Sequence, residues 1–170
     1  MARVTQPLRD EHKELIPHIE HLRTVADGID TAPPDSLAAA VDHICDFLSN
    51  HLIPHAEAEE KALYPAVAKA IGAPEATRTM AREHVEVRAL ADELLALREA
   101  AGTQAFAHEQ VHDLRRLLYG LYALIKVHFA EEEEVYLPIL DERLSEEEAK
   151  AMFEAMGHAA HDAKEHAGAH

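Results

Sequence analysis

The stretch HAEAEEKALYP at residues 55–65 occurs a second time, in similar form, as HFAEEEEVYLP at residues 128–138. Each copy begins with a histidine, has glutamates four and five residues later, and ends with a proline ten residues after the histidine. Residues four apart lie on one face of an α-helix, one turn above each other. Each copy therefore predicts a helix that presents a histidine and a glutamate on the same side.

The repeat extends to the region before each copy. The dipeptide Glu-His occurs at residues 11–12 and again at residues 83–84, which is 72 residues later. His12 lies 43 residues before the first His-x3-Glu motif, and His84 lies 44 residues before the second. Each half of the chain is thus expected to form a pair of helices, with one histidine on the first helix and the His-x3-Glu motif on the second.

Glycine, proline and a capping motif divide the chain into helical stretches, and no segment has the pattern of a strand. The dividing positions are Gly28 with residues 31–35, residues 72–74, residues 102–103, Pro138, and the capping box at residues 145–148. Apolar residues recur at steps of three and four within each stretch, which indicates amphipathic helices. We therefore predict an all-α protein: an up-down-up-down antiparallel four-helix bundle with a short C-terminal helix and a tail.

The predicted bundle with its short fifth helix spans residues 1–157, and a His-rich tail, which we expect to be flexible, spans residues 158–170. Prolines also fall inside the pattern. Pro17 and Pro54 are expected to kink or interrupt their helices, because proline removes a backbone hydrogen bond. Pro65 and Pro138 are expected to end theirs.

Polar residues occupy core positions of all four predicted helices. His12, His55, His84 and His128 lie on the apolar seams, where a bundle normally has Leu or Ile. A single core histidine is more often a hydrogen-bonded packing residue than a ligand, but four in matched register point to a shared site. Two further seam positions are Glu59 and Glu132.

Four imidazoles and two carboxylates can hold two metal ions. Each ion would take two imidazoles, and both carboxylates could bridge the pair, as in related bundle sites. Mixed imidazole and carboxylate ligation suits iron and leaves coordination positions open for a small ligand. A metal would also explain how two carboxylates can be buried, which is very costly without a cation.

The pattern of these six residues resembles the hemerythrin-like (HHE) domain, over roughly residues 8–140. The resemblance implies two non-haem iron ions with an oxo or hydroxo bridge, with manganese as an alternative metal. Members of this family bind dioxygen reversibly, sense oxygen or iron, or act on peroxide or nitric oxide.

The sequence departs from the oxygen carriers of the family, which have two histidines four residues apart on the third helix. Here Met80 lies four residues before His84, and Arg88 lies four residues after it. The missing ligand weakens the oxygen-carrier interpretation and favours chemistry at the metal.

His51 is the first candidate to replace the missing ligand. It lies on the seam one turn before His55, where the repeat has Leu124. It could bind the metal, or it could donate a hydrogen bond to a ligand or a bound water. Tyr119 and Tyr122 are weaker candidates.

The leading functional hypothesis is an oxidoreductase that disproportionates hydrogen peroxide, as a catalase does. The alternative is a module that binds or senses oxygen, nitric oxide or iron without turnover. Iron donation to damaged iron–sulfur proteins ranks third, because no cysteine-containing N-terminal segment is present. A purely structural bundle ranks last, because it leaves the six seam residues unexplained.

Charge and composition exclude other classes of partner. The chain has 16 Lys and Arg against 32 Asp and Glu, which gives a formal net charge of −16. Nucleic acids and anionic membranes require basic surfaces, so neither is expected as a partner. The single cysteine, Cys45, excludes an intramolecular disulfide, and no signal peptide or membrane span is evident, so a cytoplasmic location is expected. A small diatomic molecule or a peroxide is the expected ligand, and the sequence leaves a protein partner open.

Overall fold

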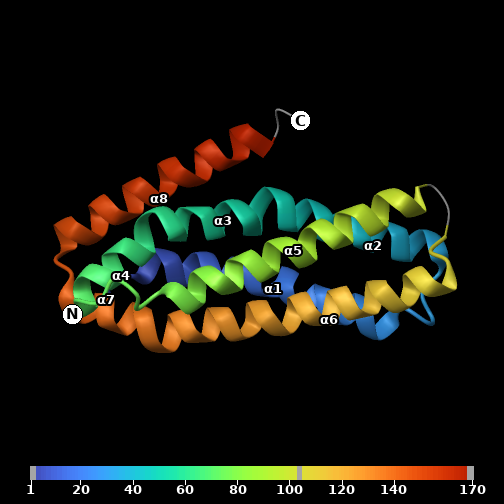
Figure 1. The fold of residues 1–170 in the computed structure, drawn as a ribbon, viewed down its shortest axis with the longest axis horizontal. Coiled ribbons are helices and arrows are strands. Elements are labelled where there is room, and N and C mark those ends of the chain that lie inside the picture. The colour runs from blue at the N-terminus through green and yellow to red at the C-terminus, as the bar shows by residue number, and fades with distance from the viewer. Residues whose placement is uncertain (1–2, 103–104, 168–170) are drawn as a thin grey trace.

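The computed structural model describes residues 3–102 and 105–167, and these residues form helices and connecting turns without a strand (Figure 1). The all-α class predicted from the sequence is therefore confirmed. The α-helices are α1 (Gln6–Gly28), α2 (Pro34–Phe47), α3 (Ile53–Ala58), α4 (Tyr64–Ile71), α5 (Arg78–Ala101), α6 (His108–Glu131), α7 (Leu137–Arg143) and α8 (Glu146–Ala167). Three π-helical turns join some of them: η1 (Leu48–Leu52), η2 (Glu59–Leu63) and η3 (Glu132–Tyr136).

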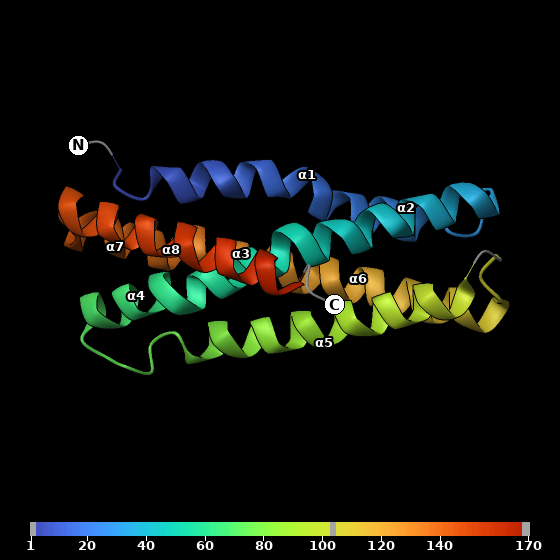
Figure 2. The same cartoon turned by 90° about the horizontal axis from the view of Figure 1, so that it is seen from above.

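The π-helical turns join the shorter helices into long rods. The second rod runs through α2, η1, α3, η2 and α4, and the fourth runs through α6, η3 and α7, while α1 and α5 are rods by themselves. Figures 1 and 2 show the four rods side by side along the long axis, with successive rods running in opposite directions. α1 and α5 each pack against both α2 and α6, so the rods enclose a common interior.

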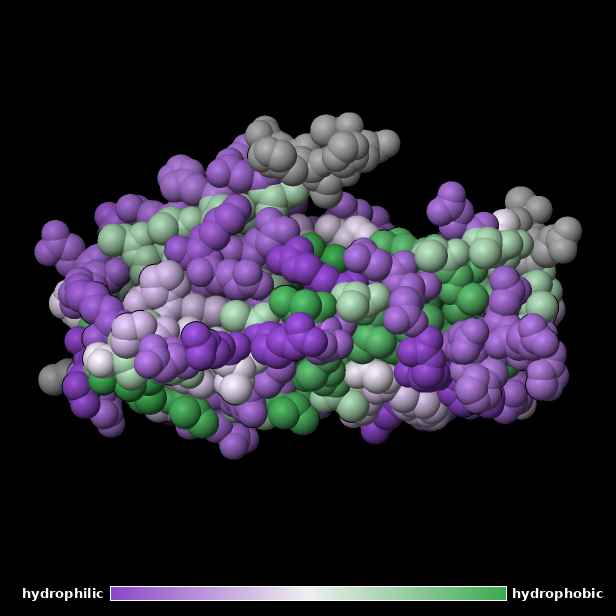
Figure 3. Space-filling model, viewed as in Figure 1, coloured by the Kyte–Doolittle hydropathy of each residue, from purple (hydrophilic) through white to green (hydrophobic). Residues whose placement is uncertain are grey.

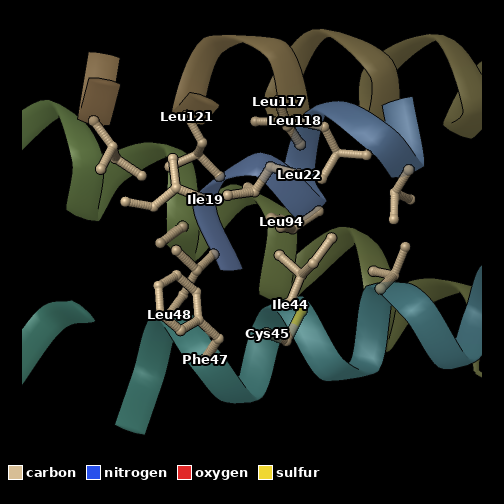
Figure 4. Packing of buried hydrophobic residues seen from close by; sticks show 14 of the residues in the cluster. Ile19, Leu22, Ile44, Cys45, Phe47, Leu48, Leu94, Leu117, Leu118 and Leu121 are labelled. Carbon is tan, nitrogen blue, oxygen red and sulfur yellow. The ribbon is translucent and has the colours of Figure 1, made fainter. Parts of the chain in front are cut away.

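Two apolar clusters fill this interior. The larger includes Ile19, Ile44, Leu94 and Leu121, one from each rod, whose side chains point toward one another in Figure 4. The larger buried side chains of the smaller cluster are those of Leu8, Leu63, Tyr64, Val67, Met80, Leu137, Leu140, Met152 and Met156. Along every rod, the seam histidine lies between a residue of one cluster and a residue of the other. The predicted polar residues therefore form a layer between two apolar regions.

The fifth long helix, α8, is longer than the short helix that the sequence predicted. It has 22 residues and packs along α3 and η2, where Met152, Met156 and Ala159 are buried (Figure 1). The predicted capping box opens it, since Ser145 and Glu148 exchange hydrogen bonds at 3.1–3.2 Å. α8 includes residues 158–167 of the predicted tail, because apolar side chains continue along the face that meets α3. The last tail residues, 168–170, lie outside the described ranges.

Proline explains the position of each π-helical turn. Pro54, Pro65 and Pro138 each follow a π-helical turn by two residues. The carbonyl four residues before each proline belongs to the middle residue of that turn. Proline has no N–H for this carbonyl and its ring clashes with it, and the extra residue of a π-helical turn relieves the clash.

The prediction that Pro65 and Pro138 end their helices is therefore wrong, because the chain continues directly into α4 and α7. The predicted interruption near Pro54 is confirmed as η1. Pro17 lies inside α1, which continues without a break to Gly28.

The surface is largely polar. Figure 3 shows one face covered mostly by hydrophilic residues, with smaller hydrophobic patches among them. Within the described ranges, none of the helices combines the length and the hydrophobicity of a membrane span.

Replacement of Leu121 by Ala should lower the free energy of unfolding by about 2–5 kcal/mol, because this side chain is fully buried among all four rods. Val127→Ala, six residues further along α6, is the control, and it should change stability by less than about 0.5 kcal/mol because Val127 is 55% exposed. Urea denaturation of both variants in the same metal state measures the difference. Equal losses would contradict this description of the core.

Candidate metal centre

The structure brings six of the sequence-predicted site residues together in the polar layer. They are His12, His55, Glu59, His84, His128 and Glu132, and each is at most 4% exposed. They form two groups that could each hold an ion. The first group consists of His12, His55, Glu59 and Glu132, and the second consists of Glu59, His84 and His128. Within each group the ligand atoms lie within 4.8 Å of one another.

Glu59 faces both groups. Its Oε1 lies 2.9 Å from Nε2 of His55, and its Oε2 lies 3.4 Å from Nε2 of His84. Glu132 is placed in the same way, with Oε2 3.4 Å from Nε2 of His12 and Oε1 3.4 Å from Nε2 of His128. Both carboxylates therefore present one oxygen to each histidine pair, which is the arrangement that a bridging ligand needs.

A second ring of carboxylates holds the outer side of the four histidines. The Nδ1 atom of each of the four imidazoles lies 2.8–3.0 Å from a glutamate oxygen. The pairs are His12 with Glu133, His84 with Glu60, His55 with Glu11, and His128 with Glu83. These contacts follow the sequence repeat. A carboxylate at Nδ1 fixes the tautomer and aims Nε2 at the centre, as in many metal sites.

Glu60 and Glu133 lie at the outer edge of the centre. Their side chains are 38% and 31% exposed, so they do reach the surface, but each also binds a histidine of the centre. Both glutamates come one residue after the central glutamate of their half, and this repeated position is the sequence signal for their contact with a histidine.

Several central atoms are buried and have no hydrogen-bond partner among the described residues. They are Nε2 of His12, Nε2 of His55, both oxygens of Glu59 and Oε2 of Glu132. Buried polar atoms without partners are costly, and native proteins rarely tolerate so many in one place. All of them are atoms that can bind a cation. The donor set of imidazole nitrogens and carboxylate oxygens therefore fits a metal of the iron type.

The electrostatics of the layer also favour positive charge. Burial lowers the pKa of His12, but Glu132 and Glu59 outweigh it and raise the pKa to about 9. Burial also lowers the pKa of His55, but Glu59 and Glu11 outweigh it and raise the pKa to about 10. At His128, Glu132 and Glu59 outweigh burial in the same way, and the pKa is about 11. Burial raises the pKa of Glu59, yet the surrounding histidines hold it well below its usual value. Without metal, protons thus supply the positive charge; a metal would displace them, so its binding strengthens as pH rises.

Tyr64 belongs to the centre and was not predicted. Its buried hydroxyl lies 3.1 Å from Nε2 of His84 and 3.3 Å from Nε2 of His128, and it donates a hydrogen bond of 3.1 Å to Glu132. Burial, followed by the charge of Glu59, raises the pKa of Tyr64 far above its usual value. The phenol therefore stays protonated when no cation is present.

The π-helical turn η2 is the reason that Tyr64 was missed. Tyr64 lies five residues after Glu59, and in a regular α-helix the fifth residue is turned by about 140° from the first. The hydrogen bonds of a π-helix join residues five apart, so η2 brings Tyr64 over Glu59. The sequence did contain a sign that Tyr64 is special, since the equivalent residue of the second half is the apolar Leu137.

The two groups differ in their surroundings. Phe129 stacks on His12, with ring centroids 4.3 Å apart, and its equivalent in the first half is Ala56. The first group thus has an aromatic hydrocarbon beside it, and the second group has the phenol of Tyr64. A cavity of about 10 Å³, lined by Leu52, Val87, Ile125 and Phe129 and by ligand residues of both groups, adjoins the centre. This is room for about one water-sized molecule.

His51 does not lie in the centre. Its side chain is exposed and stacks near Phe47, because η1 shifts the register by one residue and places Leu52 on the seam, 3% exposed. Tyr119 donates a hydrogen bond to Asp27, and Tyr122 lies under the guanidinium of Arg23, so neither tyrosine reaches the centre.

Comparison with known proteins agrees with this geometry. The family model of the hemerythrin HHE cation binding domain matches residues 3–140, a range that contains all six central residues and Tyr64 but not α8. No curated protein and no solved structure gave a match. The match covers most of the chain, and the chain belongs to the hemerythrin HHE cation-binding domain family.

Proposed function

We propose that the protein holds two non-haem iron ions in the polar layer and acts on a small oxidant, with hydrogen peroxide as the substrate. The observation that carries the proposal is the pair of ligand groups that share Glu59, with their buried unpartnered atoms. In this proposal His12 and His55 hold one ion, His84 and His128 hold the other, and Glu59 and Glu132 bridge them. The four rods then form the family's up-down-up-down bundle, with α8 as an addition.

Bound iron would supply one-electron steps between its ferrous and ferric states, and manganese could do the same. In the overall reaction one peroxide is oxidised to dioxygen and a second is reduced to two waters, so no external reductant is needed. The protein supplies the enclosure. The small apolar cavity beside both groups admits a ligand of only a few atoms and excludes larger reductants.

Tyr64 is proposed as a further ligand of the second ion. Its hydroxyl lies 3.1 Å from Nε2 of His84 and 3.3 Å from Nε2 of His128. Its ring belongs to the same apolar cluster as Met80, which stands four residues before His84, where a second histidine would be expected in an oxygen carrier. The raised pKa means that the phenol gives up its proton only to a strong positive charge, such as a metal ion.

A second candidate function is binding or sensing of a small ligand without turnover, in the cytoplasm. The observation in its favour is α8, which lies outside the family match and packs against η2, the turn that begins with Glu59. A change at the centre could pass through η2 to α8 and to a partner protein.

Peroxide turnover tests the leading proposal. Protein loaded anaerobically with ferrous iron should bind about two ions per chain and release dioxygen from peroxide. His55→Ala should reduce both by more than about tenfold, because it removes a proposed ligand and the imidazole nearest to Glu59. His51→Ala, four residues away, is the control and should behave as wild type because His51 is exposed. Full iron loading without dioxygen release would favour the sensing function instead.

The charge of Glu59 is tested separately through metal content. Glu59→Gln keeps the shape but removes the negative charge that faces both groups, so the chain should retain fewer than about half of its ions after dialysis. Glu57→Gln is the matched control, because Glu57 lies on the same helix and pairs with Arg88 away from the centre. Elemental analysis gives the metal content. Unchanged content in the Glu59 variant would show that the carboxylate does not bind metal.

Tyr64→Phe tests the phenol. Tyrosinate bound to ferric iron absorbs visible light by charge transfer, so the wild-type protein should show this band and the variant should lose it while keeping most of its iron. Tyr122→Phe should leave the band unchanged, since Tyr122 lies away from the centre. A band that survives in Tyr64→Phe, or no band in the wild-type protein, would exclude Tyr64 as a ligand.

A further inference from the structure

A pocket of about 390 Å³ lies between α1 and the junction of α6 and η3 in the fourth rod, on the outer side of His12. We call it the cationic pocket, because Arg3, Arg9, Lys13 and Lys126 line it. These are four of the 16 basic residues of a chain with 32 acidic ones, and the one acidic residue in the lining is Glu133. Its volume falls in the usual range for small-molecule sites.

The two lysines are available to a ligand. Lys13 pairs with Asp10 at 3.0 Å and Lys126 pairs with Glu20 at 2.9 Å, but these lysine side chains are 68% and 41% exposed. Exposed pairs of this kind contribute little to stability and are easily rearranged. Either ammonium group can therefore turn toward an anion in the pocket.

Arg9 gives the pocket a fixed, buried donor. Its side chain is 9% exposed and binds Glu133 and Asp141, while its Nε is buried and has no hydrogen-bond partner in the described part of the chain. A guanidinium N–H in this state is rare, because native proteins satisfy nearly all of their buried polar groups. Glu133 and Asp141 already balance the charge of Arg9, so what a ligand oxygen in the pocket could add is an acceptor for the Nε–H.

The remaining lining is apolar. Ile16, Phe129 and Ala130 form it, and Ile16 is 38% exposed although it is a large hydrophobic side chain. Inorganic anions would leave this surface uncovered. An apolar body that carries one carboxylate would cover it and bring its charge to the basic residues.

We propose that the cationic pocket binds a small organic carboxylate with an apolar body, such as an aromatic acid. Bound there, the ligand contacts Phe129 and His12 from outside and does not enter the cavity between the two ion positions. The binding does not depend on the metal chemistry proposed above. It does place the ligand beside Glu133, which pairs with Arg9 and also holds Nδ1 of His12.

Benzoate is a suitable probe, and benzamide is its neutral counterpart. Equilibrium dialysis of the full-length protein, with its metal content measured, should show one benzoate per chain and at least about tenfold weaker binding of benzamide. Added salt should weaken benzoate binding. Lys126→Gln should weaken it roughly threefold to fivefold, whereas Lys69→Gln, which removes a similar exposed pair with Glu148, should not.

A second variant tests the apolar lining. Ile16→Glu places a negative charge inside the pocket and should abolish benzoate binding, whereas Val85→Glu, at a comparably exposed position on α5, should not. Equal binding of benzoate and benzamide would overturn the proposal, as would the absence of saturable binding. Benzoate bound directly to a metal ion would be insensitive to Lys126→Gln and to Ile16→Glu, and that result would also overturn it.

Discussion

Two carboxylates buried between two apolar clusters are the constraint on which this fold depends. Glu59 and Glu132 are fully buried, and no lysine or arginine pairs with either of them among the described residues. Positive charge must therefore come from imidazoles with their protons or from metal ions. One imidazole comes from each rod, so the charge is balanced only when all four rods are assembled. This requirement links the packing of the bundle to the composition of its centre.

The prolines are the second element that the centre requires. In both halves a proline ten residues after the histidine follows a π-helical turn that begins at the central glutamate, in η2 and in η3, and that turn accommodates the proline ring. Such turns change which residues follow the glutamate on the same face, and they are frequent at functional sites. Here the following residue on that face is Tyr64 in one half and Leu137 in the other. Proline thus acts on the composition of the centre, although it contacts no ligand.

The sequence was sufficient for the six central residues, because two copies of one pattern with matched gaps leave few alternatives to a common site. It was not sufficient for His51 and Tyr64. The positions of His51 and Tyr64 have the same physical cause: the π-helical turns η1 and η2 shift the residues that face the interior away from the positions that a regular α-helix would give. At the equivalent positions His51 and Leu124, the histidine is exposed and the leucine is only partly buried. The same comparison at Tyr64 and Leu137 concerns a buried pair. The length of α8 was also missed, because small residues such as Ala159 pack on α3 as effectively as large ones.

The duplicated ligands and the unequal surroundings together limit what the centre can do. If both halves had kept the same neighbours, the two groups of potential ligands would be equivalent, and any difference between them would have to come from a bound ligand. Instead, Phe129 covers the first group and Tyr64 approaches the second. Beyond the shared carboxylates, a phenol oxygen lies beside only one of the two groups, while the other faces the hydrocarbon of Phe129. Directional chemistry on a small symmetric molecule needs such a difference, and here it arises from two substitutions outside the repeated ligand pattern.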